Sequence, residues 1–131
     1  MIGLDTNVLV RYLTQDDPNQ SHRANRFVSD AVARGEALHI SAIVICETVW
    51  VLRGAYRVGK PEILRALARI LDTAQFSIED ADACREALAE YAAGRGDFSD
   101  YLIGARNRRA GSSTTATFDG KLRGSDLFRV L

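Results

Sequence analysis

The chain lacks any apolar run near the roughly 20 residues that a membrane-spanning helix requires, which argues against a membrane protein of that kind. Its N-terminus has no basic segment ahead of an apolar one, so no secretory signal is visible. It has only two cysteines, Cys46 and Cys84, and they form no closely spaced metal or redox motif. These absences predict a cytoplasmic protein with free thiols and no disulfide.

Histidine and lysine are also scarce. His22 and His39 are the two histidines, and neither has the spacing of a zinc ligand, so we expect no zinc site. The formal net charge is zero, so no overall field draws the chain toward nucleic acid. Fifteen of the seventeen cationic residues are arginine. Because arginine binds phosphates and carboxylates equally well, this bias alone selects no partner.

The 131 residues, 47% of them hydrophobic and 26% charged, suit one globular domain spanning 1–131. Short strands alternate with helices along the chain, which predicts an α/β fold. The expected architecture is a three-layer α/β/α domain around a mainly parallel sheet of four to five short strands. We expect strands at 2–4, 37–40, 76–78, 114–118 and 127–131, and helices at 6–13, 18–35, 42–58, 61–71, 80–93 and 99–110.

Two of the expected strands end in an aspartate. Asp5 follows the first apolar run, and Asp119 follows the β-branched run that ends at Phe118. By itself Asp5 is a good N-cap for the next helix, and Asp119-Gly120 is an ordinary turn. Carboxyl ends of parallel strands meet at one sheet edge, however, and ligands collect at that edge. We therefore expect the two carboxylates to lie close together.

Glu47 stands out within the helix expected at 42–58. From Ala42 to Leu52 this helix is apolar on every face except at Glu47 and Thr48, which is typical of a buried helix. A buried carboxylate needs a partner, because desolvation of the bare charge costs several kcal/mol. That partner could be a buried arginine or a cation. Trp50, in the same helix, is expected in the core.

Asp100 lies in the first turn of the helix expected at 99–110, where an acid also complements the helix dipole. Asp97 could cap the same helix or add a further acid. If Asp5, Glu47 and Asp119 converge with Asp100, the four charges require compensation. Oxygen ligands in that number suit Mg²⁺ or Mn²⁺, and such sites serve phosphoryl chemistry.

At this point the sequence resembles a known family. Asp5-Thr-Asn-Val8, the stretch 41–52 around Glu47, Asp97-Phe-Ser-Asp100 and Thr117-Phe-Asp119 are similar, in order and spacing, to the four motifs of PIN-domain ribonucleases. The length of the chain and the spacing of its motifs most resemble the VapC toxins of type II toxin–antitoxin systems. The resemblance covers essentially the whole chain.

The resemblance implies a Mg²⁺- or Mn²⁺-dependent endoribonuclease whose carboxylates are those of Asp5, Glu47, Asp100 and Asp119. In this assignment Asp5 and Asp100 hold the principal ion, and other side chains orient the ligands; these are Thr6, Asn7, Asp97 and Thr117. RNA would be the substrate, cut by hydrolysis. The family also implies a homodimer and a cognate VapB-type antitoxin as partner.

Cationic side chains flank the third and fourth motifs, and three of them are candidates for gripping RNA phosphates. Arg95 precedes the sixth expected helix, Arg106 lies within it, and Lys121 follows Asp119. The alternative for Arg106 is a favourable interaction with the C-terminal dipole of its own helix.

Two other classes of function remain open from the sequence. A haloacid-dehalogenase-like phosphatase also begins with an aspartate after a strand, but that chemistry requires a second aspartate where this chain has Asn7. A catalytically silent module that binds RNA or a partner would have no reason to keep Glu47 in an apolar helix.

Overall fold

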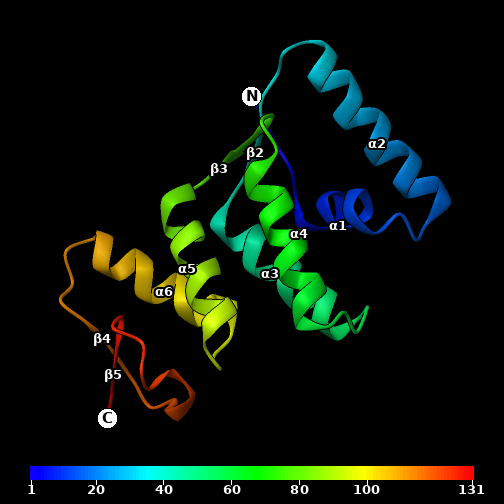
Figure 1. Cartoon of the computed structure of the whole chain (residues 1–131). Helices are drawn as coiled ribbons and strands as arrows, with labels where there is room; N and C mark the ends of the chain where they lie inside the picture. Colours follow the sequence, from blue (N-terminus) through cyan, green and yellow to red (C-terminus); the bar gives the residue numbers. More distant parts are fainter. The chain divides into compact units, whose positions relative to one another are not determined.

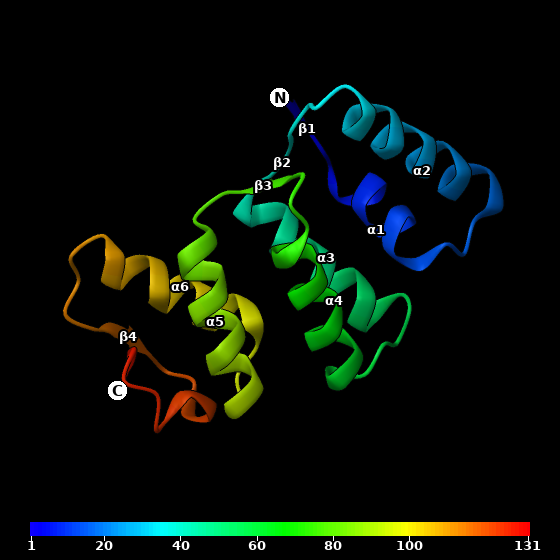
Figure 2. The ribbon, with the colours of Figure 1, turned by 45° about the horizontal axis from the view of Figure 1, so that its top comes forward.

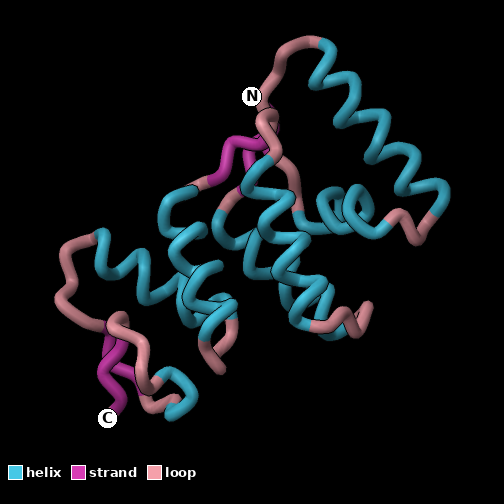
Figure 3. Tube along the Cα trace, viewed as in Figure 1, coloured by secondary structure: helices cyan, strands magenta, loops and turns pink.

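The computed structural model describes every residue from Met1 to Leu131. Contacts divide the chain into two compact units, Met1–Glu79 and Asp80–Leu131, which are described in turn. Figure 1 labels the elements of both units, and Figure 3 distinguishes the short strands from the more extensive helices. None of the helices has both the length and the hydropathy that crossing a membrane would require.

Three short strands form the sheet of unit 1. They are β1 (Ile2–Gly3), β2 (Leu38–Ile40) and β3 (Phe76–Ile78), with β2 in the centre and both neighbours parallel to it. Leu38 pairs with Ile2 on one side and with Phe76 on the other. Leu38 and Ile40 are completely buried, so the alternate residues of the central strand fasten the sheet to the core.

Each parallel connection in unit 1 passes through a pair of helices, because parallel strands cannot be joined by a tight turn. The helices α1 (Thr6–Thr14) and α2 (Pro18–Ala33) link β1 to β2. The helices α3 (Ala42–Gly54) and α4 (Lys60–Asp72) link β2 to β3 and lie beside each other in Figure 2. Ser41 caps α3 by accepting a hydrogen bond from the Val44 N–H at 3.3 Å, as its sequence position predicts.

The helix α3 differs from its prediction in length and in burial. It ends at Gly54 rather than at residue 58, and Arg57 then adopts a left-handed φ of 53°. One face of α3 is exposed rather than buried, with Ile43 69% and Trp50 54% exposed, and Glu47 lies on this face between them. The prediction of an entirely buried helix, with Trp50 in the core, is therefore wrong. Apolar periodicity identifies residues able to enter a core but does not show which of them have a partner.

Unit 2 pairs two helices and two strands. The helices α5 (Ala81–Ala93) and α6 (Phe98–Arg109) pack against each other, with Tyr91 and Phe98 meeting edge to face at 6.2 Å between ring centroids. The strands β4 (Thr115–Thr117) and β5 (Phe128–Val130) are parallel and are joined through the short 3-10 helix η1 (Gly120–Leu122). The sequence predicts only a turn where η1 begins.

Two glycines allow close packing in unit 2. A Cβ on Gly104 of α6 would lie 2.8 Å from the Phe128 ring, so α6 approaches β5 at this point. A Cβ on Gly96, in the loop before α6, would overlap the side chain of Leu122. The segment before α6 therefore lies against η1, which brings the third and fourth sequence motifs together within unit 2.

The α/β class and the parallel pairing of strands are confirmed, since all three strand pairings are parallel and six α-helices connect the strands. All five expected strands are present. They belong to a three-stranded sheet in unit 1 and a two-stranded sheet in unit 2. Each strand contains only two or three residues, so the ladders are short and the helices supply most of the packing.

Candidate active site

Asp5 lies where β1 gives way to α1. It is the N-cap of α1, and its Oδ1 accepts a hydrogen bond from the Val8 N–H at 3.2 Å. The capping role suggested by the sequence is therefore present. The residue is exposed to solvent, so its carboxylate remains accessible to a ligand at the end of the strand.

Glu47 comes to the same end of unit 1 from α3. The hydroxyl of Thr6 donates a hydrogen bond to its Oε1 at 2.9 Å, so the residue after Asp5 contacts Glu47 directly. The sequence left two possible partners for Glu47, an arginine or a cation. In the structure its carboxylate is bonded to Thr6 and to no arginine. Glu47 is exposed rather than desolvated, which corrects the expectation of a buried carboxylate. The structure therefore brings the first and second motifs together.

The third motif forms the start of α6. Asp97 is the N-cap residue, and Oδ2 of Asp100 accepts a hydrogen bond from the Asp97 N–H at 3.1 Å. This is one half of a capping box, in which the acid at the third helical position reaches back to the cap. Both aspartates are partly exposed.

The fourth motif forms the start of η1. Oδ1 of Asp119 accepts a hydrogen bond from the Lys121 N–H at 2.9 Å, and the Asp119 N–H donates to Thr117 Oγ1 at 3.1 Å. The threonine thus fixes the backbone of the aspartate, and the aspartate begins the helical turn. Asp80 stands directly before α5, where an aspartate would usually cap the helix, but it has a left-handed φ of 51° and its side chain forms no capping hydrogen bond.

The four motif carboxylates share one kind of arrangement. Each uses one oxygen to accept a hydrogen bond from an N–H or hydroxyl near the end of a strand or the start of a helix. For Asp5, Glu47 and Asp100 the second oxygen is available, whereas Oδ2 of Asp119 lies 3.9 Å from Lys121 Nζ. Asp5 and Glu47 belong to unit 1, and Asp100 and Asp119 to unit 2. Within neither unit do three or more His, Cys, Asp or Glu side chains gather as a metal-binding group.

The three cationic candidates differ in whether an acidic side chain of the protein already pairs with them. Arg106 forms an ion pair with Asp80, with 2.9 Å between Nε and Oδ2. Lys121 Nζ lies 3.9 Å from Asp119 Oδ2, and both side chains are partly exposed. Arg95 lies exposed in the loop between α5 and α6. Arg95 and Lys121 thus remain more available to a phosphate than Arg106.

A groove of about 500 Å³ lies between α1 and α2 and reaches the end of β1. Asp5 and Asn7 line it at the strand end, and the opposite wall includes Arg23 and Phe27 of α2. The sequence analysis missed the two α2 residues. Gln20, Arg23, Ala24 and Phe27 recur at the spacing of one helix face, which is the signal that could have identified this wall.

Side-chain hydrogen bonds fix the two walls of the groove. Arg11 of α1 donates from Nε to Gln20 of α2 at 2.7 Å and from Nη1 to Asp16 at 3.1 Å and Tyr56 at 2.6 Å. The hydrogen bond from Thr14 is the main reason that the pKa of Asp16 is lowered to about 2, and Tyr56 and Arg11 contribute. These hydrogen bonds fix α1 and α2 relative to each other.

A family model described as "PIN domain" matches residues 2–125. The chain is also 26% identical over 120 residues to a protein from Aquifex aeolicus (strain VF5) named "VapC ribonuclease". That alignment covers 92% of this chain and 88% of the relative. No solved structure matches the chain. The family match spans all four sequence motifs and both units of the structure.

Proposed function

Because the chain belongs to the PIN-domain family, we propose that it is a metal-dependent endoribonuclease and the toxin of a VapBC-type toxin–antitoxin system. The observation that carries the proposal is the common arrangement of the four motif carboxylates. Each is oriented by one hydrogen bond, and those of Asp5, Glu47 and Asp100 keep a second oxygen for a ligand, while the second oxygen of Asp119 faces Lys121. The similarity to a protein named as a ribonuclease supports RNA as the substrate.

The donor set fits a hard divalent cation. The four acids Asp5, Glu47, Asp100 and Asp119 offer carboxylate oxygens alone, which suits Mg²⁺ or Mn²⁺. We propose that Asp5 and Asp100 hold the principal ion, with Glu47 and Asp119 completing the acidic site. Bound there, the ion would supply activation of the attacking water and neutralisation of charge on the phosphate.

The surrounding residues orient these carboxylates and the RNA. Thr6 holds Glu47, and Thr117 holds the backbone of Asp119. Asn7 and Asp97 lie beside the acids and take the same supporting role. One of the carboxylates accepts the proton of the attacking water, and the products carry a 5′-phosphate and a 3′-hydroxyl. Arg95 and Lys121 contact RNA phosphates, and Arg106 contributes less because Asp80 already balances its charge.

The test is cleavage of a structured RNA by the purified chain with Mg²⁺ or Mn²⁺, beside Asp5→Asn and Asp100→Asn. We expect EDTA and each substitution to abolish cleavage while both variants stay folded, because asparagine can cap α1 at position 5 and its amide oxygen can accept the Asp97 N–H at position 100. Arg34→Gln, at an exposed residue after α2 that belongs to none of the motifs, serves as the control and should cleave normally. Cleavage unaffected by EDTA, or by both aspartate substitutions, would remove the proposal.

The phosphatase alternative is tested in the same preparation with p-nitrophenyl phosphate, which the chain should leave intact.

The toxin role predicts that expression of the chain arrests bacterial growth and that Asp5→Asn relieves the arrest. It also predicts that a VapB-type antitoxin encoded beside it prevents the arrest. Analytical ultracentrifugation should show a homodimer. If cells that express the active ribonuclease continue to grow, the toxin role is wrong and the ribonuclease activity stands.

A further inference from the structure

We propose that the groove between α1 and α2 binds a single-stranded segment of the RNA next to the cleaved phosphate, with Arg23 contacting a phosphate and Phe27 stacking on a base. This inference rests on the proposed ribonuclease function and adds a binding surface to it. The groove begins at Asp5 and Asn7. A strand whose phosphate reaches Asp5 therefore has a continuous path along the groove.

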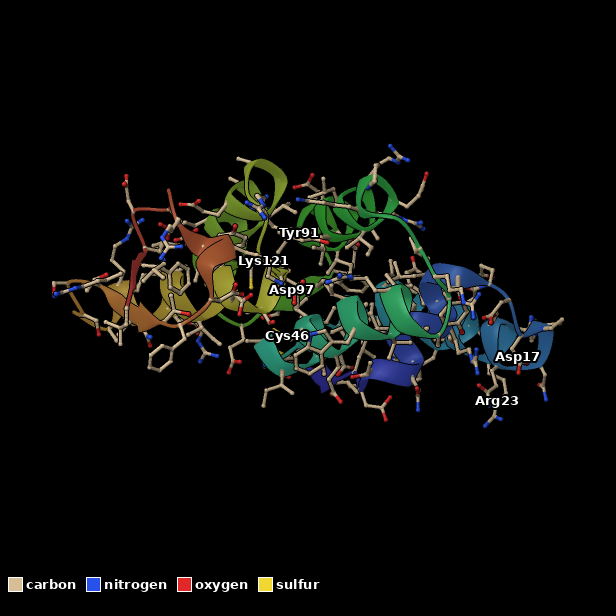
Figure 4. The ribbon with its side chains drawn as sticks, turned by 90° about the horizontal axis from the view of Figure 1, so that it is seen from below. Asp17, Arg23, Cys46, Tyr91, Asp97 and Lys121 are labelled. Atoms are coloured by element: carbon tan, nitrogen blue, oxygen red, sulfur yellow. The ribbon has the colours of Figure 1, made fainter.

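Charge is the first argument. Arg11 and Arg23 are the cationic residues that line the groove, but Arg11 is already bound to Asp16, Gln20 and Tyr56. Arg23 is exposed and makes no hydrogen bond or ion pair within the chain. Figure 4 shows its side chain extending away from α2. Arg23 thus supplies positive charge that no residue of the protein neutralises, beside an acidic position that would repel RNA by itself.

The aromatic ring is the second argument. Phe27 lies one helical turn beyond Arg23, about 6 Å along the helix axis, and lines the same groove. Its side chain is 39% exposed although phenylalanine usually contributes to a core. Bases stack on aromatic side chains only when they are free of a duplex, so Phe27 favours a loop or another unpaired segment.

The rigidity of the walls is the third argument. Besides the Arg11–Gln20 bond, Gln15 and Asn25 exchange two hydrogen bonds of 2.8 Å across the turn between α1 and α2. From this turn α2 returns along α1 (Figure 2), which places Phe27 toward the Asp5 end of the groove and Gln20 toward the turn. A preformed groove loses little conformational entropy when a flexible strand binds.

The experiment measures binding of a fluorescein-labelled oligouridine by anisotropy, in EDTA to prevent cleavage, over a series of salt concentrations. Arg23→Gln should weaken binding about tenfold and lower the salt dependence by close to one phosphate contact. Phe27→Leu should weaken binding about tenfold with unchanged salt dependence, because stacking is lost but charge is kept. Arg26→Gln, also exposed on α2 but outside the groove, is the matched control and should bind as the unmodified chain does.

The outcomes separate this inference from the proposed function. If the chain cleaves RNA but Arg23→Gln and Arg26→Gln bind oligouridine equally, the groove proposal is overturned while the nuclease remains. If the variants bind RNA normally and lose only binding to the antitoxin, the groove is a protein surface and the proposal also fails. A chain that neither binds nor cleaves RNA removes both.

Discussion

The hydroxyl of Thr6 donates a hydrogen bond to Oε1 of Glu47 over 2.9 Å, so the first turn of α1 fixes a carboxylate of α3. Thr6→Val removes the donor and keeps the side-chain shape. We expect RNA cleavage to fall by about 10- to 100-fold, as is usual when the partner of a metal-ligating residue is lost. Unfolding in urea should show a loss of about 0.5–1.5 kcal/mol.

Thr6→Ser is the control, because it keeps the hydroxyl and should cleave at a rate near that of the unmodified chain. Cleavage by Thr6→Val at the unmodified rate would show that Glu47 needs no orientation from α1.

Capping and catalysis are separable at Asp5. Asp5→Ala should lower stability by about 1 kcal/mol through loss of the cap, whereas Asp5→Asn should nearly restore it. Both should abolish cleavage. Asp17 caps α2 in the same way, accepting from the Gln20 N–H at 3.0 Å, so Asp17→Ala should cost similar stability and leave cleavage intact. Loss of cleavage in Asp17→Ala would mean that helix stability, rather than the carboxylate of Asp5, accounts for the defect.

The carboxylate of Asp16 gives a pH-dependent prediction. Its pKa is lowered from 3.8 to about 2, first of all by the hydrogen bond from Thr14. Because the folded-state pKa lies below the ordinary value, ionised Asp16 stabilises the fold above about pH 4, and this stabilisation is lost as the pH falls through 2. Thr14→Val should raise the pKa of Asp16 toward 3.8 in an NMR titration.

The stability difference between Thr14→Val and the unmodified chain should accordingly shrink between pH 4 and 2. Thr73→Val is the matched control, because the Thr73 hydroxyl lies 2.7 Å from the carbonyl oxygen of Arg69 as the Thr14 hydroxyl lies 2.9 Å from that of Val10, but Thr73 has no carboxylate partner corresponding to Asp16. Its effect should not change over this pH range. If the stability of Thr14→Val and that of Thr73→Val changed with pH in the same way, Asp16 would be excluded as the cause of the change.

Gly104 tests the packing of α6 on β5. A Cβ there would lie 2.8 Å from Phe128 and 3.0 Å from Leu127, so Gly104→Ala should lower the free energy of unfolding by about 1–3 kcal/mol. Gly54→Ala at the end of α3 meets nothing within 4 Å and should be neutral or stabilising by up to about 1 kcal/mol. Equal stability of the two variants, measured by thermal unfolding, would contradict the close approach of α6 and β5.

Most of the local structure could be predicted from the sequence, because its signals are local. Ser41 before an apolar run marks the start of α3, and the residues of β3 stand between two helices with clear ends. Capping residues at Asp5 and Asp97 depend only on the next turn of chain. Such features need no knowledge of distant partners.

The errors concern contacts that local sequence does not encode. Apolar residues around Glu47 predict burial, yet Ile43 and Trp50 remain exposed because burial depends on what packs against a face. The end of α3 at Gly54 follows from the left-handed turn at Arg57, which no periodicity marks. Arg23 and Phe27 became candidates only once α1 and α2 were seen to enclose a groove. The gathering of all four carboxylates around one ion stays a prediction.

The parallel pairing of β1, β2 and β3 has a consequence for synthesis on the ribosome. Ile2 pairs with Leu38, and Leu38 pairs with Phe76, so each strand of this sheet finds the next one only after the two helices between them have been synthesised. Yet every strand that the sheet requires lies within the first 79 residues. Nascent chains grow at about 5–20 residues per second. Unit 1 can therefore complete its sheet while Asp100 and Asp119 are still to be translated, and any nuclease that requires those two aspartates stays inactive until both have been added.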